Sequence, residues 1–220
     1  MNFIIVSRIL LGVPQRSWIL AAMLLLPALG LHAQTDPASL AHDRHEGLLV
    51  AADPYLDAAR AKETFGKANP FTAGILAVEL FLKNEGQQPI HFRLETLRLV
   101  VQPPEGQRQD LTSLSPAQVA VLIAHPGGTP SPSGGPRLPV PVPIPSGGGK
   151  ENKYTDILKP LALDADVVPP MSTLHGFVFF NLSHDFSLAA HASIYLPDVT
   201  RIPNQSLMYF EVELRPAAAR

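Results

Sequence analysis

The residues best suited to chemistry lie together near the start of the chain, in the segment His42-Asp43-Arg44-His45-Glu46. On a helix, the two histidines would share one face, where a neighbouring carboxylate could join them as ligands of a metal ion. The segment does not match the HExxH pattern of helical zinc sites, and a metal site needs several converging ligands. We therefore interpret it as a solvated polar stretch before the first strand and predict no metal ligand in it.

Three further histidines, His175, His184 and His191, lie on and between two predicted strands. If these strands pair, two imidazole rings could meet and share a metal ion or a proton. Strands and turns more often contain histidine for ordinary structural reasons. We therefore predict no shared site among the three.

Acidic residues two apart, Asp164 with Asp166 and Glu211 with Glu213, would suit glycoside hydrolysis if they lined a cleft. Residues two apart on a strand share one face, which we interpret here as the solvated face. The chain has no G-x-S-x-G motif, and residues 147–150 (GGGK) lack the other positions of a P-loop. We predict no catalytic residue, no cofactor-binding residue and no cofactor, and therefore a protein that is not an enzyme.

The first 33 residues have the three parts of a secretory signal. Residues 1–17 carry Arg8 and Arg16 and no acidic residue, residues 18–31 (WILAAMLLLPALGL) are uncharged, and Ala33 is a small residue at which signal peptidase could cut. The 14 uncharged residues are fewer than the about 20 that a membrane span needs. We predict that residues 1–33 are removed and that the protein is exported, to the periplasm or outside the cell. An uncleaved anchor is the alternative.

Charge and cysteine content restrict the partners of the mature chain. The full chain has 17 Lys and Arg and 19 Asp and Glu; removing the two arginines of the signal leaves 15 against 19, a net charge of −4. This mild acidic excess gives no electrostatic footprint for nucleic acid or for an anionic membrane. Because the chain has no cysteine, an exported form has no disulfide, and its apolar core alone must stabilise it.

A proline- and glycine-rich stretch divides the mature chain. Residues 126–149 contain eight prolines and seven glycines, and residues 139–145 (PVPVPIP) predict extended polyproline II. We interpret residues 126–150 as a disordered surface loop within one domain, residues 34–220, rather than as a linker between two domains. The loop is the best candidate for a contact with a partner protein, although a low-complexity spacer explains it more simply.

The rest of the mature chain is mainly β. Apolar and polar residues alternate with the period of a half-buried strand over residues 76–83, 90–94, 97–101, 191–196 and 208–214. The parity of the alternation changes at Glu95-Thr96, which predicts a bulge or a turn there. Residues 174–182 (LHGFVFFNL) are apolar on both faces, as in a central strand, and residues 47–52 are a further short strand candidate.

Two short helices interrupt the strands. Residues 57–65 contain good helix formers and are followed by Gly66. Residues 115–118 (SPAQ) form a capping box with proline at the first helical position, which predicts a helix that runs to residue 124. We expect each helix to cover an open end or an edge of the sheets.

Two segments resemble the immunoglobulin-like domains of uncharacterised secreted bacterial proteins. The first is residues 78–86 (VELFLKNEG) with residues 89–92 (PIHF), a strand, an Asn-x-Gly turn and a second strand. The second is residues 169–180 (PPMSTLHGFVFF). The resemblance implies an immunoglobulin-like antiparallel β-sandwich, here with two short helices and the long Pro/Gly-rich loop. Because such motifs encode turns and core strands, they imply no chemistry.

These observations favour an exported, non-enzymatic binding or structural module of unknown ligand. The alternative is an accessory or assembly subunit of a cell-envelope complex, which would contact its partner through the proline-rich loop or a strand edge. A hydrolase or a metal-dependent enzyme is a third, less favoured interpretation. We predict no nucleic-acid partner and no membrane span in the mature form.

Overall fold

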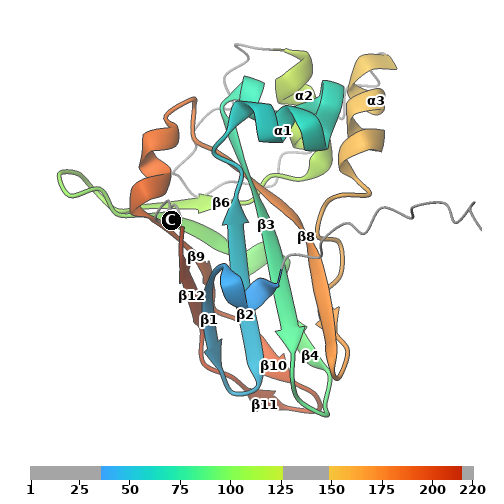
Figure 1. Ribbon diagram of the computed structural model, residues 1–220, viewed down its shortest axis with the longest axis vertical. Helices are drawn as coiled ribbons and strands as arrows, with labels where there is room; N and C mark the ends of the chain where they lie inside the picture. The colour runs from blue at the N-terminus through green and yellow to red at the C-terminus, as the bar shows by residue number, and fades with distance from the viewer. Residues whose placement is uncertain (1–35, 126–148, 215–220) are drawn as a thin grey trace, which may run out of the picture. The chain divides into compact units, whose positions relative to one another are not determined.

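The computed structural model describes residues 36–125 and 149–214, and in these residues the chain is mainly β (Figure 1). The strands form three four-stranded sheets in which every pair of strands is antiparallel. In spatial order, the first sheet contains β1 (Ala41–His45), β2 (Leu48–Pro54), β3 (Ile75–Asn84) and β8 (Ser172–Asn181). The second contains β11 (Gln205–Ser206), β10 (Val199–Arg201), β4 (Ile90–Phe92) and β7 (Val167–Val168), and the third β12 (Phe210–Glu213), β9 (Ala192–Leu196), β5 (Arg98–Val101) and β6 (Gln109–Thr112).

The second and third sheets continue one another and face the first. β4 pairs with β10 and β5 pairs with β9, and both connections, from β4 to β5 and from β9 to β10, are short. One apolar core contains residues from all three sheets, among them Leu80 of β3, Phe92 of β4, Ile194 of β9 and Phe210 of β12. The architecture therefore has two β-layers around a shared core.

Strand β3 shows how the sequence pattern produces this core. The even-numbered residues 76, 78, 80 and 82 are buried in the core between the layers, as the alternation predicts. On the opposite face, Ala77 belongs to a second apolar cluster, which α1 (Ala58–Phe65) and α3 (Gly149–Leu158) cover with Phe65 and Leu158. In Figure 1 these helices and α2 (Pro116–Ala124) lie together at the top of the molecule.

The change of parity at Glu95-Thr96 marks a 3-10 turn, η4 (Leu94–Thr96), between β4 and β5. The prediction of a bulge or a turn there is confirmed. Residues 92 and 97 are both buried, on either side of the turn, because the turn returns the chain to the core after the change of parity. The turn is also the point at which the second sheet gives way to the third.

The prediction of a central strand at residues 174–182 is wrong, since β8 is the outer strand of the first sheet. Its two faces are both apolar because one faces the core and the other carries Phe177 and Phe179 beneath the helices. Its outer edge is partly closed by irregular chain, because Leu163 N–H donates to Phe177 O (2.9 Å) and Leu114 N–H to Phe179 O (2.8 Å). Gly176 permits this approach, since a Cβ there would lie 2.7 Å from the backbone of Leu163.

Other predictions need correction. Residues 41–45 form strand β1, rather than a solvated stretch, because this segment pairs in register with β2. A third helix, α3, begins at Gly149, so the last two residues of the predicted disordered loop, 149 and 150, are helical; residues 126–148 lie outside the described residues. The strand predicted at residues 208–214 is shorter, because β12 spans Phe210–Glu213, and Met208 before it is 64% exposed.

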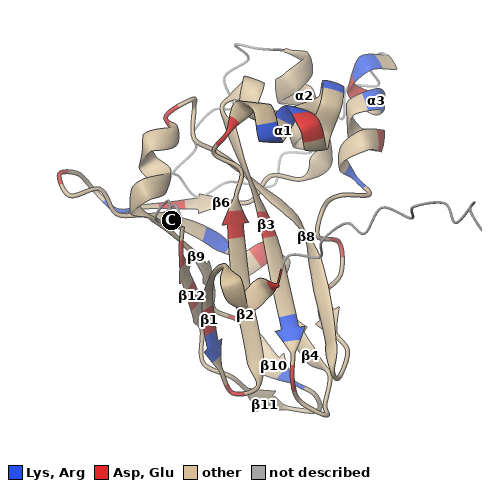
Figure 2. Cartoon of the chain, viewed as in Figure 1, with Lys and Arg blue, Asp and Glu red and all other residues tan. Residues whose placement is uncertain are grey.

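The described residues from Asp36 onward belong to one compact unit. Among the described residues, no helix combines the length and the apolar character that crossing a membrane requires. Acidic and basic residues are scattered over strands, turns and helices in Figure 2 rather than gathered on one element.

Candidate functional site

Two adjoining cavities meet at η4 and share Leu94 and Glu95 in their walls. We call them the polar pocket and the apolar pocket, and the pair the η4 groove. The polar pocket has a volume of about 550 Å³ and is lined by His91, Phe92, Arg93, Leu94, Glu95, Asp164, Ala165 and Asp166. The apolar pocket has a volume of about 420 Å³ and is lined by Leu94, Glu95, Thr112, Ser113, Leu114, Ser115, Pro116, Gln118, Ala162, Leu163, Phe177, Val178 and Phe179.

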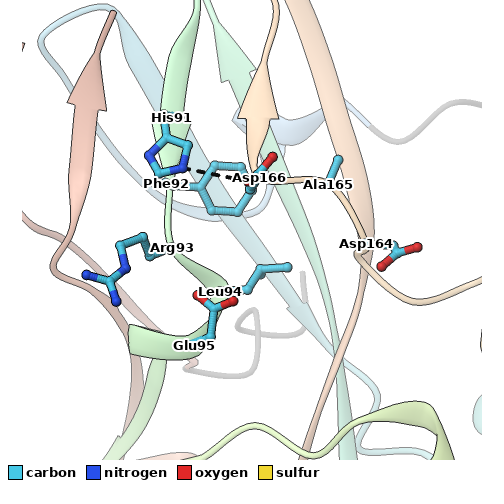
Figure 3. A pocket seen from close by; sticks show the side chains of 8 residues that line it. All are labelled: His91, Phe92, Arg93, Leu94, Glu95, Asp164, Ala165 and Asp166. Carbon is cyan, nitrogen blue, oxygen red and sulfur yellow. Dashed lines mark ion pairs between the residues drawn. The ribbon is translucent and has the colours of Figure 1, made fainter. Parts of the chain in front are cut away.

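The polar pocket lies where β4 and the chain before β7 leave their shared ladder (Figure 3). His91 pairs with Val167, and the next backbone hydrogen bond, from Phe92 N–H to Asp166 O at 2.9 Å, still joins the two walls. The imidazole Nε2 of His91 lies 3.7 Å from the carboxylate of Asp166. Beyond this point the two walls separate, because β4 runs into η4 whereas the segment before β7 extends back to Leu163.

Carboxylates dominate the charge of this pocket. Glu95, Asp164 and Asp166 are exposed, and the same pocket is lined by Arg93. Within residues 36–125 and 149–214, no ion pair involves the carboxylate of Glu95 or Asp164. The pocket therefore has a net negative charge and can attract a cationic group.

The apolar pocket is bounded by β8, by residues 162–163 and by the chain that joins β6 to α2. Leu114 is held against β8 by its hydrogen bond to Phe179. The capping box predicted for α2 is present: Ser115 Oγ accepts from Gln118 N–H (3.3 Å), and Gln118 Oε1 accepts from Ser115 N–H (2.8 Å). These two reciprocal hydrogen bonds fix the first turn of α2 as one wall of the pocket.

The structure separates His42 from His45, because residues three apart on strand β1 face opposite sides. His45 faces β12, where its Nε2 lies 3.2 Å from Tyr209 O and 3.6 Å from the Asp43 carboxylate. Its ring stacks on Phe210 with 3.9 Å between the ring centroids. His45 is thus part of the packing between two strands.

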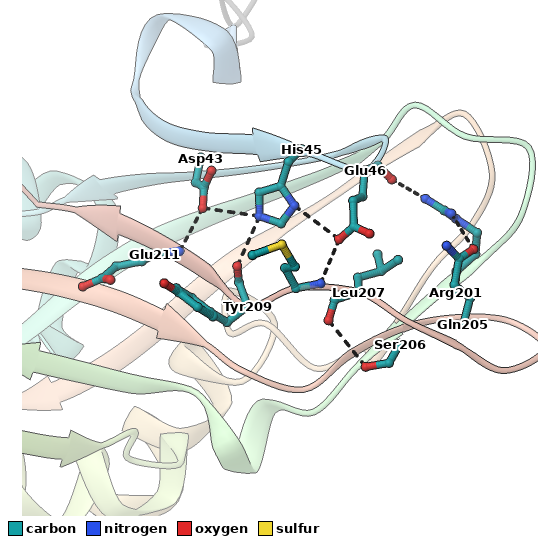
Figure 4. Close-up of polar contacts among 10 residues, drawn as sticks. Asp43, His45, Glu46, Arg201, Gln205, Ser206, Leu207, Tyr209 and Glu211 are labelled. Carbon is teal, nitrogen blue, oxygen red and sulfur yellow. Dashed lines mark hydrogen bonds and ion pairs between the residues drawn. The ribbon is translucent and has the colours of Figure 1, made fainter.

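Side chains of β1 and of Glu46, which follows it, bond the backbone of β12 and of the residues before it, a contact that we call the β1–β12 seam (Figure 4). Asp43 Oδ2 accepts from Glu211 N–H at 3.1 Å, and Glu46 Oε2 accepts from Met208 N–H at 2.8 Å. The backbone carbonyl of Glu46 accepts from the guanidinium of Arg201. These bonds satisfy an edge that would otherwise lie open, and we assign the seam a structural role.

His175, His184 and His191 do not form a shared site. β8, which carries His175, pairs with β3, whereas β9, which follows His191, pairs with β5 and β12, so the two predicted strands do not pair. His175 Nδ1 instead lies 3.2 Å from Glu79 Oε1, and its ring stacks on Phe81. Among the described residues, no group of three or more His, Asp or Glu could hold a metal ion.

Glu79 belongs to a polar cluster on the outer face of the first sheet. It also accepts a hydrogen bond from Tyr55 OH at 3.4 Å, and the guanidinium of Arg60 lies 3.8 Å from the centre of the Tyr55 ring. Arg60 bonds both oxygens of Asp53, which raises the pKa of its guanidinium. Burial raises the pKa of Tyr55. The cluster fastens α1 to the sheet, and neither cavity of the η4 groove includes it.

Sequence reasoning identified only part of the groove. The acidic pair Asp164 and Asp166 is exposed, as the sequence predicts, and both residues also line the polar pocket. His91, Arg93 and Glu95, some seventy positions earlier, carried no motif. The parity change at Glu95-Thr96 was the available signal, since it marks the turn at which the cavities meet. Glu211 and Glu213 lie on the exposed face of β12, away from both cavities.

Comparisons with known proteins give no family. No family model matches the chain, and no curated protein matches it. A solved structure, the crystal structure of a functionally unknown protein from Listeria monocytogenes EGD-e, is similar at 11% sequence identity and a TM-score of 0.32. The similarity covers 71% of this chain and 68% of that one.

Proposed function

We propose that this protein is an exported, non-enzymatic binding module whose ligand occupies the η4 groove. The observation that carries the proposal is the junction of two unlike cavities, of about 550 and 420 Å³, at one turn of the chain. Ligand sites in proteins are commonly concave, of several hundred Å³, with apolar walls and a few polar groups that orient the ligand. The groove combines these features.

Export rests on the pattern of residues 1–33, which lie outside the described residues. Amino-terminal sequencing of the protein purified from its native host tests it. A chain that begins at or near Gln34 supports a cleaved signal, whereas a chain that retains residues 1–33 contradicts it.

We further propose an immunoglobulin-like sandwich as the scaffold of the module. Two antiparallel layers around one core support this description. The resemblance concerns the layers rather than the connections, because the first sheet places three consecutive strands, β1, β2 and β3, side by side.

A variant that fills the groove tests the function. Thr112 is exposed at the wall of the apolar pocket, so Thr112→Trp should obstruct it without disturbing the core. Thr173→Trp, at an exposed strand position outside both cavities, is the matched control. After cross-linking in the native host, the wild type and Thr173→Trp should recover the same bound molecule, and Thr112→Trp should recover much less of it. Equal recovery with all three proteins would contradict a ligand in the groove.

The non-enzymatic part of the proposal has its own test, because the groove contains carboxylates that could act in hydrolysis. The wild type should turn over none of a broad panel of hydrolase substrates. Turnover that is lost in Asp164→Asn would overturn this part and leave the binding site in place.

An accessory subunit of an envelope complex is a second candidate. It is favoured by β6, the outer strand of the third sheet, in which Gln109, Asp110 and Thr112 are exposed. Such an edge can accept a strand from a partner. Cross-links from a partner to Gln109 or Asp110 of β6, which lie outside both cavities, rather than to the residues that line the groove, would favour this candidate.

A further inference from the structure

We infer that the ligand of the η4 groove is an extended polypeptide segment of a partner protein that presents a lysine or arginine side chain close to an apolar one. This inference rests on the proposed function, and it specifies the chemistry of the ligand. Each step follows from one property of the groove.

The first property is charge. The polar pocket is lined by three carboxylates, those of Glu95, Asp164 and Asp166, and by one guanidinium, that of Arg93, while His91 Nε2 lies 3.7 Å from the Asp166 carboxylate. Glu95 and Asp164 have no ion pair among the described residues, so their charge remains available to a ligand. Figure 3 shows these carboxylates on both walls of the polar pocket. A side-chain ammonium or guanidinium group placed between the walls would compensate them.

The second property is the apolar pocket beside them. Its lining includes the buried Phe177, Val178 and Phe179 of β8, the buried Leu163 and the half-buried Leu114. An apolar ligand group gains free energy when it leaves water for such a surface. A purely cationic ligand would leave this pocket unused, and a purely apolar one would leave the carboxylates uncompensated.

The third property is the distance between the two pockets. They share Leu94 and Glu95, so the two unlike groups of the ligand must be near neighbours. In an extended polypeptide, side chains two positions apart point to the same side and are separated by about 7 Å. Thr112 and Ser113 also line the apolar pocket, and a hydroxyl group directed into it would bond the backbone of such a segment.

The test uses three blocked pentapeptides, acetyl-GKGLG-amide, acetyl-GQGLG-amide and acetyl-GKGSG-amide, titrated into the mature protein and followed by amide NMR shifts. We expect the first peptide to shift the amides of residues 91–95 and 112–115 and the other two to bind at least about fivefold more weakly, the size of one exposed charge pair or one small apolar contact. Raising the NaCl concentration to about 0.5 M should remove most of the advantage of the first peptide over the second.

Two variants locate the charge effect. The double variant Glu95→Gln with Asp164→Asn should reduce the affinity for the lysine peptide about five- to tenfold. Glu105→Gln also removes a negative charge, but from an exposed position in the loop between β5 and β6, outside both cavities. It should leave the affinity unchanged. All these side chains are exposed, so the NMR spectra should show the same fold in every variant.

Three results would overturn the inference. Equal binding of the glutamine and lysine peptides at the groove would show that charge is not recognised, while the groove would remain a binding site. Spermidine that binds the groove as tightly as the lysine peptide would make a small amine the ligand. No shift at the groove with any peptide would exclude a basic peptide, and the Thr112→Trp experiment would then decide the proposed function independently.

Discussion

Asn84 shows how one buried polar side chain determines the end of a strand. It is 1% exposed, and its Nδ2 group lies within hydrogen-bond distance of three backbone carbonyls, those of Gln88 (2.8 Å), Val168 (3.2 Å) and Pro169 (3.1 Å). Its Oδ1 accepts from Gly86 N–H at 2.9 Å. The side chain therefore joins the end of β3, the turn that follows it and the end of β7.

Replacing Asn84 by alanine should destabilise the protein strongly. The substitution leaves several buried backbone groups without a partner, so we expect the free energy of unfolding to fall by about 2–4 kcal/mol. Gln87→Ala, at an exposed position of the same turn, is the control and should change it by less than about 0.5 kcal/mol. Urea unfolding followed by circular dichroism measures both. A small loss in Asn84→Ala would mean that water replaces the side chain.

At the scale of elements, the β1–β12 seam joins two sheets through side chains rather than through a backbone ladder. The inward residues of β1, Asp43 and His45, are polar, although they face the core side of the first sheet. They are tolerated there because the backbone groups of Tyr209 and Glu211 bond them. An edge strand with inward polar residues is thus satisfied by the edge of another sheet.

Loss of a seam bond should appear locally. In Asp43→Ala, the amide of Glu211 loses a charged acceptor worth about 1.5 kcal/mol, so its hydrogen exchange should become about tenfold faster. His42→Ala, on the opposite face of β1, should leave that amide unchanged. Hydrogen exchange measured by NMR gives both rates. Unchanged exchange of Glu211 in Asp43→Ala would show that Asp43 does not stabilise the seam.

At the scale of the whole molecule, the two long sides of the layered structure differ. On one side, the seam closes the gap between β1 and β12. On the other side, beside β8 and the end of β6, the η4 groove remains open. The helices α2 and α3 stand next to this open side, and His125 at the end of α2 bonds Glu151 of α3 at 2.8 Å.

Because this contact joins the described segments on either side of residues 126–148, that stretch should be dispensable for folding. Replacing residues 128–148 by Gly-Ser-Gly-Ser should leave the free energy of unfolding unchanged or raise it by about 1 kcal/mol, since a shorter loop costs less to close. Thermal unfolding measures this. If the stretch contacts a partner, the variant should also associate more weakly in a pull-down. A large loss of stability would show that the stretch contributes to the fold.

The sequence by itself determined the local structure of this protein. Alternation specified the core faces of β3, β4 and β9, the Ser115-Pro116 cap specified the start of α2, and the parity change specified a turn at η4. Each of these features depends on residues within a few positions of one another, so the pattern contains the information. The predictions were least reliable at the ends of elements, as where the strand predicted from residue 208 begins only at Phe210.

Tertiary structure alone decided which strands are neighbours and therefore which side chains meet. The pairing of β4 with β7 brings His91, Arg93 and Glu95 to Asp164 and Asp166, and the meeting of β1 with β12 gives His45 its partners. Local patterns carry no information on these long-range pairings, because the alternation of a strand is the same beside any neighbour. Such pairings form the groove, so only the tertiary structure shows which of its side chains lie together.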